Sequence, residues 1–386
     1  MQLPTRIDRY PAKMVTRLAL SLVSRHASDA SLLLDPFCGS GAILSACSKL
    51  NIPSIGMDIN PYAVLLSRVK INGFNTAKAI EACRAWVEAA RDCKTKEPLP
   101  LINANYWFVP TTLSKFEQLR ASWTNSKPKS QSTTDALLLA LALSARICSR
   151  ADNRSPKPYI SKSARYLKVG SNCDPFNALS IILEDLASAH RSLQHLKSAR
   201  VHRIDFRTES KRYLGDESVS HIITSPPYLN AQDYYRNFKL ELALLEKLVS
   251  FDLVKVKLGM IGTERGNLLE SLRSDDLRVY ESIIPIQFAS PRKKAVLLRY
   301  LSDMDRVIAQ FARALRPSGT CVVICGDNCI DGQYICTYDL LSFLMTRNGF
   351  RLHERYGDVI LRRMIPPDRV GHKSLIKEEK ISVYSK

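Results

Sequence analysis

The stretch Asp35-Pro36-Phe37-Cys38-Gly39-Ser40-Gly41 lies between an apolar run, Ser31–Leu34, and a helical pattern, Ala42–Leu50. Glycines at a strand-to-helix turn let the backbone approach a ligand closely and open the helix N-terminus toward it. The turn is not a phosphate-gripping loop, because no Gly-Lys-Ser/Thr follows, and it lacks the third glycine of the dinucleotide pattern. It predicts a ligand site at the end of the first strand.

A second acidic strand end supports this prediction. Asp58 closes the next apolar run, Ser54–Asp58, where a carboxylate can accept hydrogen bonds from both hydroxyls of a ribose. A small-residue turn combined with an acid at the second strand indicates a nucleoside cofactor, which need not be a dinucleotide.

Alternation of strands and helices predicts the fold class. Helical patterns at Ala42–Leu50, Pro61–Asn72 and Tyr338–Asn348 follow three of five strand-like runs, which indicates βαβ units and a parallel sheet. Two later strands, around Arg351–Arg362 and Ile381–Tyr384, have no helix between them and are expected to pair antiparallel at the sheet edge. The five expected strands are Ser31–Asp35, Ser54–Asp58, Val201–Asp205, His221–Ser225 and Thr320–Gly326.

A long helical interval interrupts this pattern and suggests the domain division. Residues 1–74 and 200–386 are expected to form the α/β domain, and residues 75–199 a mainly helical insertion. Between Thr111 and Asn172 eleven Lys or Arg face three acids, with Tyr159 and Tyr166 interleaved. This segment is either a phosphate-backbone contact and candidate DNA-recognition element, or a solvated insertion whose charge keeps it soluble. The helices expected there are Ala77–Cys93, Thr111–Trp123, Thr134–Arg150 and Pro175–Ser198.

Bulk composition favours a polyanionic partner. Lys and Arg number 56 against 37 acids, a net charge of +19, which suits nucleic acid first and an anionic membrane second. The most apolar run, Ala136–Ala145, is too short for a membrane span, which needs about 20 residues, so a buried helix is expected. A polar amino-terminal segment without a secretory core and ten scattered cysteines fit a cytoplasmic protein with reduced thiols.

No metal site is expected. Cys321, Cys325 and Cys329 recur at intervals of four, but no CxxC or HxxxH pair accompanies them. Cys321 and Cys325 lie in one strand-like run, where they would share a face and act as small core residues.

The segment Thr224-Ser225-Pro226-Pro227-Tyr228 carries the chemistry, because it follows a strand at the edge where ligands of open α/β sheets bind. Adjacent prolines have fixed φ angles and no N–H groups. The Ser225 hydroxyl and the Pro226 carbonyl can accept from an amine, while Tyr228 stacks on a flat heterocycle. The alternative is a proline-stiffened loop with a buried tyrosine, which the first motif makes less favourable.

Together, Asp35–Gly41 and Ser225–Tyr228 resemble the amino-methyltransferases of DNA, which methylate cytosine N4 or adenine N6. The Thr-Ser-Pro-Pro-Tyr version looks like the N4-cytosine branch, whereas the adenine branch more often has Asp or Asn in place of Ser225. Ala42 departs from the family, which usually has Thr there. Further stretches that resemble the family are Tyr10–Lys13, Gly56–Pro61, Thr224–Tyr235, Ile261–Arg265 and Lys377–Lys386.

The resemblance implies a class I, Rossmann-like methyltransferase fold that binds S-adenosylmethionine. Asp58 would bind the ribose hydroxyls, and Asp205 would lie near the adenine amine unless it only caps the turn before Phe206. The resemblance also implies double-stranded DNA as a partner and raises a companion restriction endonuclease. Other implied cofactor-side residues are Lys13, Asp35, Phe37, Gly39 and Gly41, and the implied catalytic residues are Ser225, Pro226, Pro227 and Tyr228.

Three other functions stay open on the sequence. The same motifs suit an N6-adenine DNA methyltransferase, which only the identity of Ser225 disfavours. An RNA base amino-methyltransferase would use a similar turn, although no appended RNA-binding module is recognisable. From a different class, the chain could be an inactive DNA-binding subunit that keeps the fold.

Overall fold

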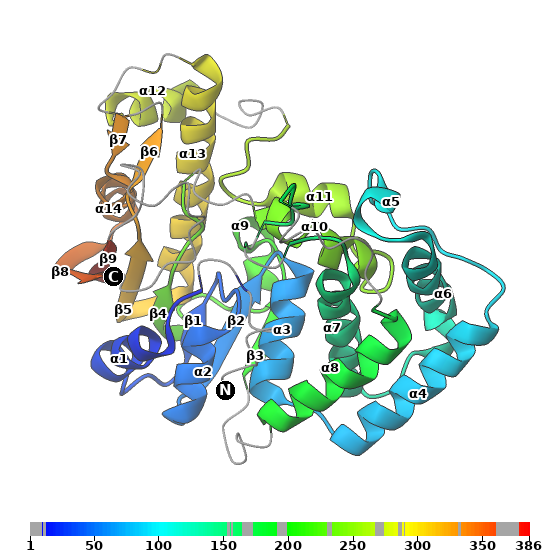
Figure 1. Cartoon of the computed structure of the whole chain (residues 1–386). Helices are drawn as coiled ribbons and strands as arrows, with labels where there is room; N and C mark the ends of the chain where they lie inside the picture. The colour runs from blue at the N-terminus through cyan, green and yellow to red at the C-terminus, as the bar shows by residue number, and fades with distance from the viewer. Residues whose placement is uncertain are drawn as a thin grey trace.

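The computed structural model places a seven-stranded sheet beside a bundle of helices (Figure 1). It describes residues 10, 13–152, 155, 157–163, 173–190, 199–229, 234–266, 274–284, 288, 290–330, 333–359 and 378–386. Parts of several predicted segments lie outside these residues: Pro11 and Ala12, residues 191–198, 230–233 and 360–362, Lys377, and the cations Arg154, Arg165 and Lys168 with Tyr166.

The sheet has the order β3-β2-β1-β4-β5-β9-β8. The first five strands in this order are parallel, whereas β9 runs antiparallel to both β5 and β8. The predicted mostly parallel sheet with an antiparallel edge pair is therefore confirmed. The strands are β1 (Leu33–Asp35), β2 (Ser54–Asp58), β3 (Arg200–Arg203), β4 (Val219–Thr224), β5 (Leu315–Cys325), β8 (Arg351–Val359) and β9 (Glu378–Ser385).

Several strand bounds depart from the prediction by a few residues, most clearly at β3 and β5. β3 ends at Arg203, two residues before the expected Asp205, because Asp205 instead caps the short helix α9 (Phe206–Glu209). β5 begins five residues before the predicted Thr320. A small hairpin that the sequence did not indicate, β6 (Asn328–Ile330) and β7 (Gln333–Ile335), follows β5.

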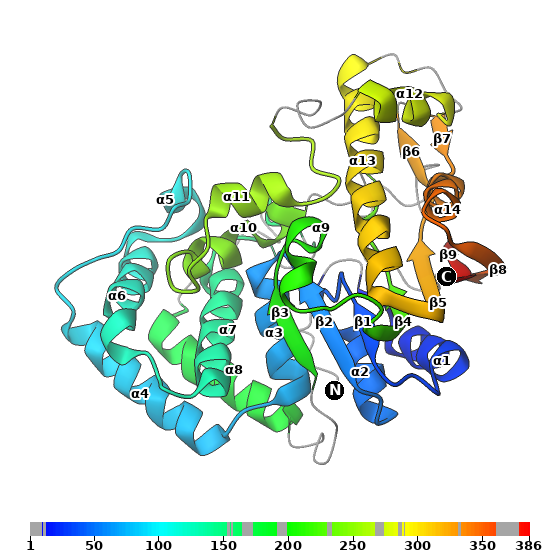
Figure 2. The same ribbon diagram turned by 180° about the vertical axis from the view of Figure 1, so that it is seen from behind.

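Helices cover both faces of the sheet (Figures 1 and 2). On one face α1 and α2 pack against apolar residues that include Ile223 and Val322. On the other face the long helix α13 packs with α14 through residues such as Phe311 and Leu341. These helices are α1 (Thr16–His26), α2 (Ala42–Lys49), α3 (Pro61–Asn72), α13 (Pro291–Ala314) and α14 (Thr337–Arg347).

Residues 76–190 contain the expected helices and form the core of the bundle. Helix α7 is buried almost along its whole length and packs against α3, α8 and α10, so its apolar run is a core helix. Among the described residues no helix combines the length and apolarity that crossing a membrane requires. The helices are α4 (Thr76–Asp92), α5 (Ala104–Trp107), α6 (Pro110–Ser126), α7 (Gln131–Cys148) and α8 (Pro175–His190).

Three helices from the second half of the chain complete the molecule: α10 (Tyr234–Leu245), α11 (Leu253–Gly259) and α12 (Ser274–Ser282). Although α10 follows the proline turn in sequence, it packs into the same core as α7. The division into an α/β domain and a separate insertion stays a prediction.

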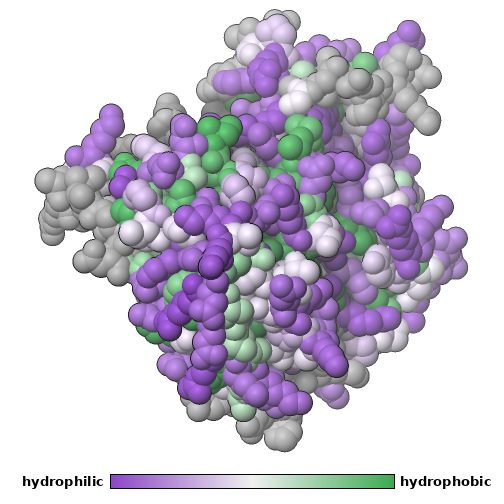
Figure 3. Space-filling view, turned by 90° about the vertical axis from the view of Figure 1, so that its right-hand side faces the viewer, coloured by the Kyte–Doolittle hydropathy of each residue, from purple (hydrophilic) through white to green (hydrophobic). Residues whose placement is uncertain are grey.

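Eight of the eleven cations predicted for a phosphate-binding patch are among the described residues, and two of these eight are buried. Arg120 on α6 is 2% exposed and donates to the carbonyls of Ala243 and Leu244 in the last turn of α10, both at 2.8 Å. Arg146 is 7% exposed and donates to the carbonyl of Asp152 at 3.1 Å. These guanidiniums therefore stabilise the bundle from within, because buried carbonyls need donors. The outer face over α4 and α6 is nevertheless mainly hydrophilic (Figure 3).

Candidate functional site

The two predicted turns lie at the same edge of the sheet. β1 and β4 pair in parallel, with Leu33 opposite His221 and Leu34 opposite Ile222, so both strands end side by side. At that edge the hydroxyl of Thr224 donates to a carboxylate oxygen of Asp35 at 2.7 Å. The glycine turn and the proline turn are thus held directly against each other.

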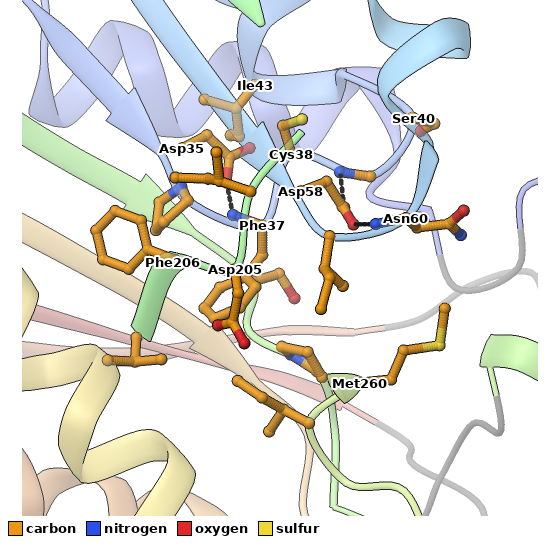
Figure 4. Close-up of a pocket in the computed structure, with 18 of the residues that line it drawn as sticks. Asp35, Phe37, Cys38, Ser40, Ile43, Asp58, Asn60, Asp205, Phe206 and Met260 are labelled. Carbon is orange, nitrogen blue, oxygen red and sulfur yellow. Dashed lines mark hydrogen bonds between the residues drawn. The ribbon is translucent and has the colours of Figure 1, made fainter. Parts of the chain in front are cut away.

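A single pocket is formed between these turns (Figure 4). Gly41 and Pro226 are not among its lining residues: Pro226 is buried, and a Cβ on Gly41 would lie 2.9 Å from Oγ of Ser67. The structure brings the other nine predicted site residues together, namely Lys13, Asp35, Phe37, Gly39, Asp58, Asp205, Ser225, Pro227 and Tyr228.

The glycine turn needs its glycines for their backbone conformation. Gly39 has φ +47° and Gly41 has φ +72°, in the left-handed region that side chains disfavour. A Cβ on Gly39 would also lie 3.2 Å from the ring of Tyr10, which packs over the turn. The hydroxyl of Ser67 on α3 donates to the carbonyl of Gly39 at 2.8 Å and fixes the loop from behind.

Asp58 organises the pocket wall. Its two carboxylate oxygens accept from the backbone N–H groups of Gly39 at 3.0 Å and Asn60 at 2.8 Å (Figure 4). Each oxygen keeps a second lone pair, so these bonds leave room for ligand hydroxyls. Burial raises the pKa of Asp58 to about 6.

Asp35 lies deeper, between the two turns. It is 3% exposed and accepts from the backbone N–H of Phe37 at 3.2 Å as well as from Thr224. Burial raises its pKa to about 7, although these two hydrogen bonds act in the opposite direction. Its neighbour Cys38 is buried too, which raises the pKa of that thiol well above its usual value. Cys38 therefore acts as a turn residue and is a poor nucleophile.

The sequence left open whether Asp205 lies on the cofactor side or only caps the turn before Phe206. Its position in the structure is compatible with both roles. It lines the pocket, and it also caps α9 by accepting from the backbone N–H of Arg207 at 3.1 Å. The Arg207 side chain, only 8% exposed, pairs with Asp205 at 2.6 Å and with Asp303 of α13 at 2.5 Å. It also donates to the carbonyl of Gly259 at 2.6 Å, which anchors the carboxyl end of α11 at the pocket.

Sequence reasoning missed several residues of the pocket. Arg207 has no distinguishing motif, and its partner Asp303 lies far away in the sequence. Ile59, Phe206 and Met260 contribute apolar wall, which suits a flat ring (Figure 4). Asn60 could have been found, because an Asn before Pro61 is a typical helix cap; its side-chain oxygen accepts from the N–H of Tyr62 at 3.0 Å.

At the proline turn, hydroxyl groups form a chain. The Ser225 hydroxyl donates to the hydroxyl of Tyr228 at 3.5 Å, and Tyr228 donates to a carboxylate oxygen of Glu379 on β9 at 3.4 Å. Glu379 was also missed. It lies in the family-like stretch Lys377–Lys386, but β9 reaches the turn only through the folding of the sheet.

The pocket fits a nucleoside cofactor. Gly39 exposes backbone in the pocket, Asp58 offers acceptors for hydroxyls, and the apolar wall suits a heterocycle. The residues therefore fit S-adenosylmethionine, with Lys13 and Phe37 at the same pocket.

Strand order and pocket together define a class I methyltransferase fold. In this fold five parallel strands carry the cofactor turn on the central strand, and an antiparallel strand is inserted beside the fifth. The predicted fold class is confirmed.

Comparison with known proteins points to one family. Residues 2–68 match the DNA methylase family. A type II methyltransferase of Methanocaldococcus jannaschii, M.MjaII, is 35% identical over 72 residues, which are 19% of this chain and 14% of that protein. The type II methyltransferase M.BsoBI of Geobacillus stearothermophilus is 25% identical over 268 residues, 61% of this chain and 52% of that protein. The resemblance to DNA amino-methyltransferases is thereby confirmed.

The matches have clear bounds. The chain spans about half or less of the length of these two relatives. Among solved structures, TTHA0409 of Thermus thermophilus in complex with S-adenosyl-L-methionine is 18% identical, covers 47% of this chain and 53% of its own, and has a TM-score of 0.25. That score is too low for a conclusion, so the fold assignment rests on the strand order.

Proposed function

We propose that this protein transfers a methyl group from S-adenosylmethionine to an exocyclic amine of a DNA base, with N4 of cytosine as the target. One observation carries the proposal: Ser225 and Tyr228 line the same pocket as Gly39 and Asp58, across the hydrogen bond between Thr224 and Asp35. A donor bound at the glycine turn and an amine bound at the proline turn would therefore meet.

When bound, the cofactor supplies an electrophilic methyl group. The chain's residues supply orientation. The lone pair of a cytosine amine is delocalised into the ring and attacks poorly. Acceptance of an N–H group by the Ser225 hydroxyl, which lines the pocket, would favour a pyramidal nitrogen whose lone pair points at the methyl. No covalent bond between protein and base is needed.

The base must leave the helical stack to enter the pocket. Extrusion costs a few kcal/mol, and stacking on the ring of Tyr228 would offset part of it. Tyr228 is 9% exposed and lines the pocket.

A cluster of cations on and beside α10 supports DNA as the partner. Lys239 on α10 lies with Nζ 3.7 Å from the ring centre of Trp107 on α5. Burial, then the nearby cations Lys157 and Arg236, lower the pKa of Lys239 to about 8. Such crowding of cations suits a phosphate backbone. We therefore keep residues 75–199 as the candidate DNA-recognition element.

The companion endonuclease and the cytoplasmic location belong to this proposal. The two matched relatives are named type II methyltransferases. Each of the nine cysteines that the structure describes is a free thiol, which agrees with a reducing compartment.

The decisive experiment identifies the product. Purified protein is incubated with DNA and S-adenosylmethionine, the DNA is digested to nucleosides, and the modified nucleoside is identified by mass spectrometry. Detection of N4-methyldeoxycytidine supports the proposal. N6-methyldeoxyadenosine would move the target to adenine, and modification of RNA alone would make the protein an RNA enzyme. Failure to bind S-adenosylmethionine in calorimetry would favour the inactive DNA-binding subunit.

A further inference from the structure

A carboxylate that was not among the predicted site residues lies behind the proline turn. Glu379 is near the start of β9, opposite Asp358 of β8 in the antiparallel edge pair. Its Oε1 accepts from the Tyr228 hydroxyl at 3.4 Å, and the Tyr228 hydroxyl accepts from Ser225 at 3.5 Å. The side chains of Ser225, Tyr228 and Glu379 are thus hydrogen-bonded in series from the pocket to the edge of the sheet.

The direction of these hydrogen bonds determines which lone pairs remain available to a ligand. Ser225 donates its hydroxyl hydrogen to Tyr228, and Tyr228 donates its own to Glu379. The lone pairs of the Ser225 oxygen are consequently left for an N–H donor in the pocket. An amine that gains a methyl group must also lose a proton, so an outlet for that proton is required.

We propose that Ser225, Tyr228 and Glu379 form a proton relay that carries the amine proton to Glu379 during methyl transfer. This inference rests on the proposed function. The nitrogen lone pair forms the new N–C bond while the S–C bond breaks and its electron pair stays on sulfur. The nitrogen proton passes to Ser225, the Ser225 proton to Tyr228, and the Tyr228 proton to the carboxylate of Glu379. The sulfonium loses its positive charge and Glu379 loses its negative charge, so the net charge of the site stays the same.

Glu379 suits the role of proton acceptor. Burial, the largest cause, and the like charge of Asp358 both raise its pKa, which strengthens it as a base, although the hydrogen bond from Tyr228 acts the other way. Within its own strand the adjacent charges are Glu378 and Lys380, which pair with each other at 3.3 Å. The Tyr228 hydroxyl faces Glu379 from the proline turn, and Asp358 faces it from β8.

The test compares Glu379→Gln and Tyr228→Phe with the full-length wild-type protein. Single-turnover methyl transfer to DNA is measured from about pH 5.5 to about pH 8.5, a range in which general bases commonly act. We expect each variant to be slowed about 10- to 100-fold near neutral pH. The wild-type rate should fall as acid protonates Glu379, and both variants should lose this dependence. The double variant should be no slower than the slower single variant, because either substitution alone already interrupts the relay.

Binding measurements separate the relay from a structural role. Affinity for S-adenosylmethionine and for DNA, measured by calorimetry, should stay within about threefold in both variants. Tyr228→Phe keeps the ring that stacks on the base, and Glu379 is not among the residues that line the pocket. Glu378→Gln, which removes the neighbouring carboxylate that pairs with Lys380, is the matched control and should keep the wild-type rate and pH profile.

The relay would be overturned if Glu379→Gln kept the wild-type rate and pH profile, or if its loss of rate came entirely from weakened binding. These outcomes differ from failure of the proposed function, in which the wild-type protein itself would leave no methylated base in DNA.

Discussion

The hydroxyl of Thr224 donates at 2.7 Å to the carboxylate of Asp35, and this bond joins the two turns that form the pocket. Both residues end neighbouring parallel strands, so the contact follows from the pairing of β1 with β4. Because the bond is buried, it fixes the spacing between the cofactor side and the base side of the pocket. Chemistry that transfers a group between two bound molecules depends on such spacing.

Replacement of Ser225 by Ala should abolish most methyl transfer while cofactor binding persists. Loss of one hydrogen-bonding group to the reacting centre typically lowers the rate about 100- to 1000-fold. Initial rates with radiolabelled S-adenosylmethionine and calorimetric affinity measure the two effects. Ser218→Ala, at an exposed serine that donates to the carbonyl of Gly215, is the control. Full activity in Ser225→Ala would show that the proposed amine contact is wrong.

Replacement of Asp58 by Ala should weaken S-adenosylmethionine binding about tenfold or more, because it removes the acceptors for ribose hydroxyls and also releases the backbone of Gly39. Calorimetric titration of the purified variant measures the change. Asp92→Ala, at an exposed position ending α4, provides the comparison. An unchanged affinity in Asp58→Ala would place the ribose elsewhere.

Asp35 should make stability depend on pH. Its folded-state pKa of about 7 lies above the ordinary value of 3.8, so the folded state holds this proton more tightly than the unfolded state. The corresponding stabilisation is complete below about pH 4 and is lost as the pH rises through about 7. Asp58, with a pKa raised to about 6, acts in the same direction in wild type and variant alike.

Asp35→Asn removes this term, and the oxygen of Asn can still accept from Thr224. The stability of the variant relative to wild type, both without cofactor, should therefore rise by about 2 to 3 kcal/mol between roughly pH 5 and pH 8. Urea unfolding at a series of pH values measures the difference. Parallel stability curves for the two proteins would contradict the raised pKa.

Arg207 should contribute strongly to stability because it is buried between Asp205 and Asp303. Arg207→Met leaves the buried Asp303 without its closest cation, and breaking a buried pair in this way costs about 3 to 5 kcal/mol. Chemical denaturation measures the loss. Arg212→Met removes an ion pair whose guanidinium is 72% exposed, and it should change stability by less than about 1 kcal/mol. Similar effects of the two substitutions would argue against the buried network.

Adding Asp303→Leu to Arg207→Met should recover part of the lost stability, because the unpaired buried charge disappears together with its partner. Cofactor affinity should nevertheless stay reduced, since Gly259 loses its anchor and lines the pocket. This separation of stability from affinity would be absent if Arg207 acted only as a fold-stabilising residue.

Local chemistry along the chain was enough to predict the sheet, most helices and nine residues of the pocket. Glycines with positive φ, a capping Asn before Pro61, and apolar runs ending in acids act within a few residues, so their meaning can be read from the sequence. The parallel pairing could be predicted because such runs alternate with helices, whereas the strand order came from the structure. The proline turn was placed correctly at a strand end for the same reason.

Tertiary structure alone decided which distant residues meet these turns. Glu379 reaches Tyr228 because β9 inserts between β5 and β8, and Arg207 meets Asp303 because α13 packs under the sheet. Arg120 and Arg146 look like surface cations in the sequence, yet packing buries them against carbonyl groups. Long-range contacts of this kind depend on how whole elements pack, and no local pattern of residue types encodes them.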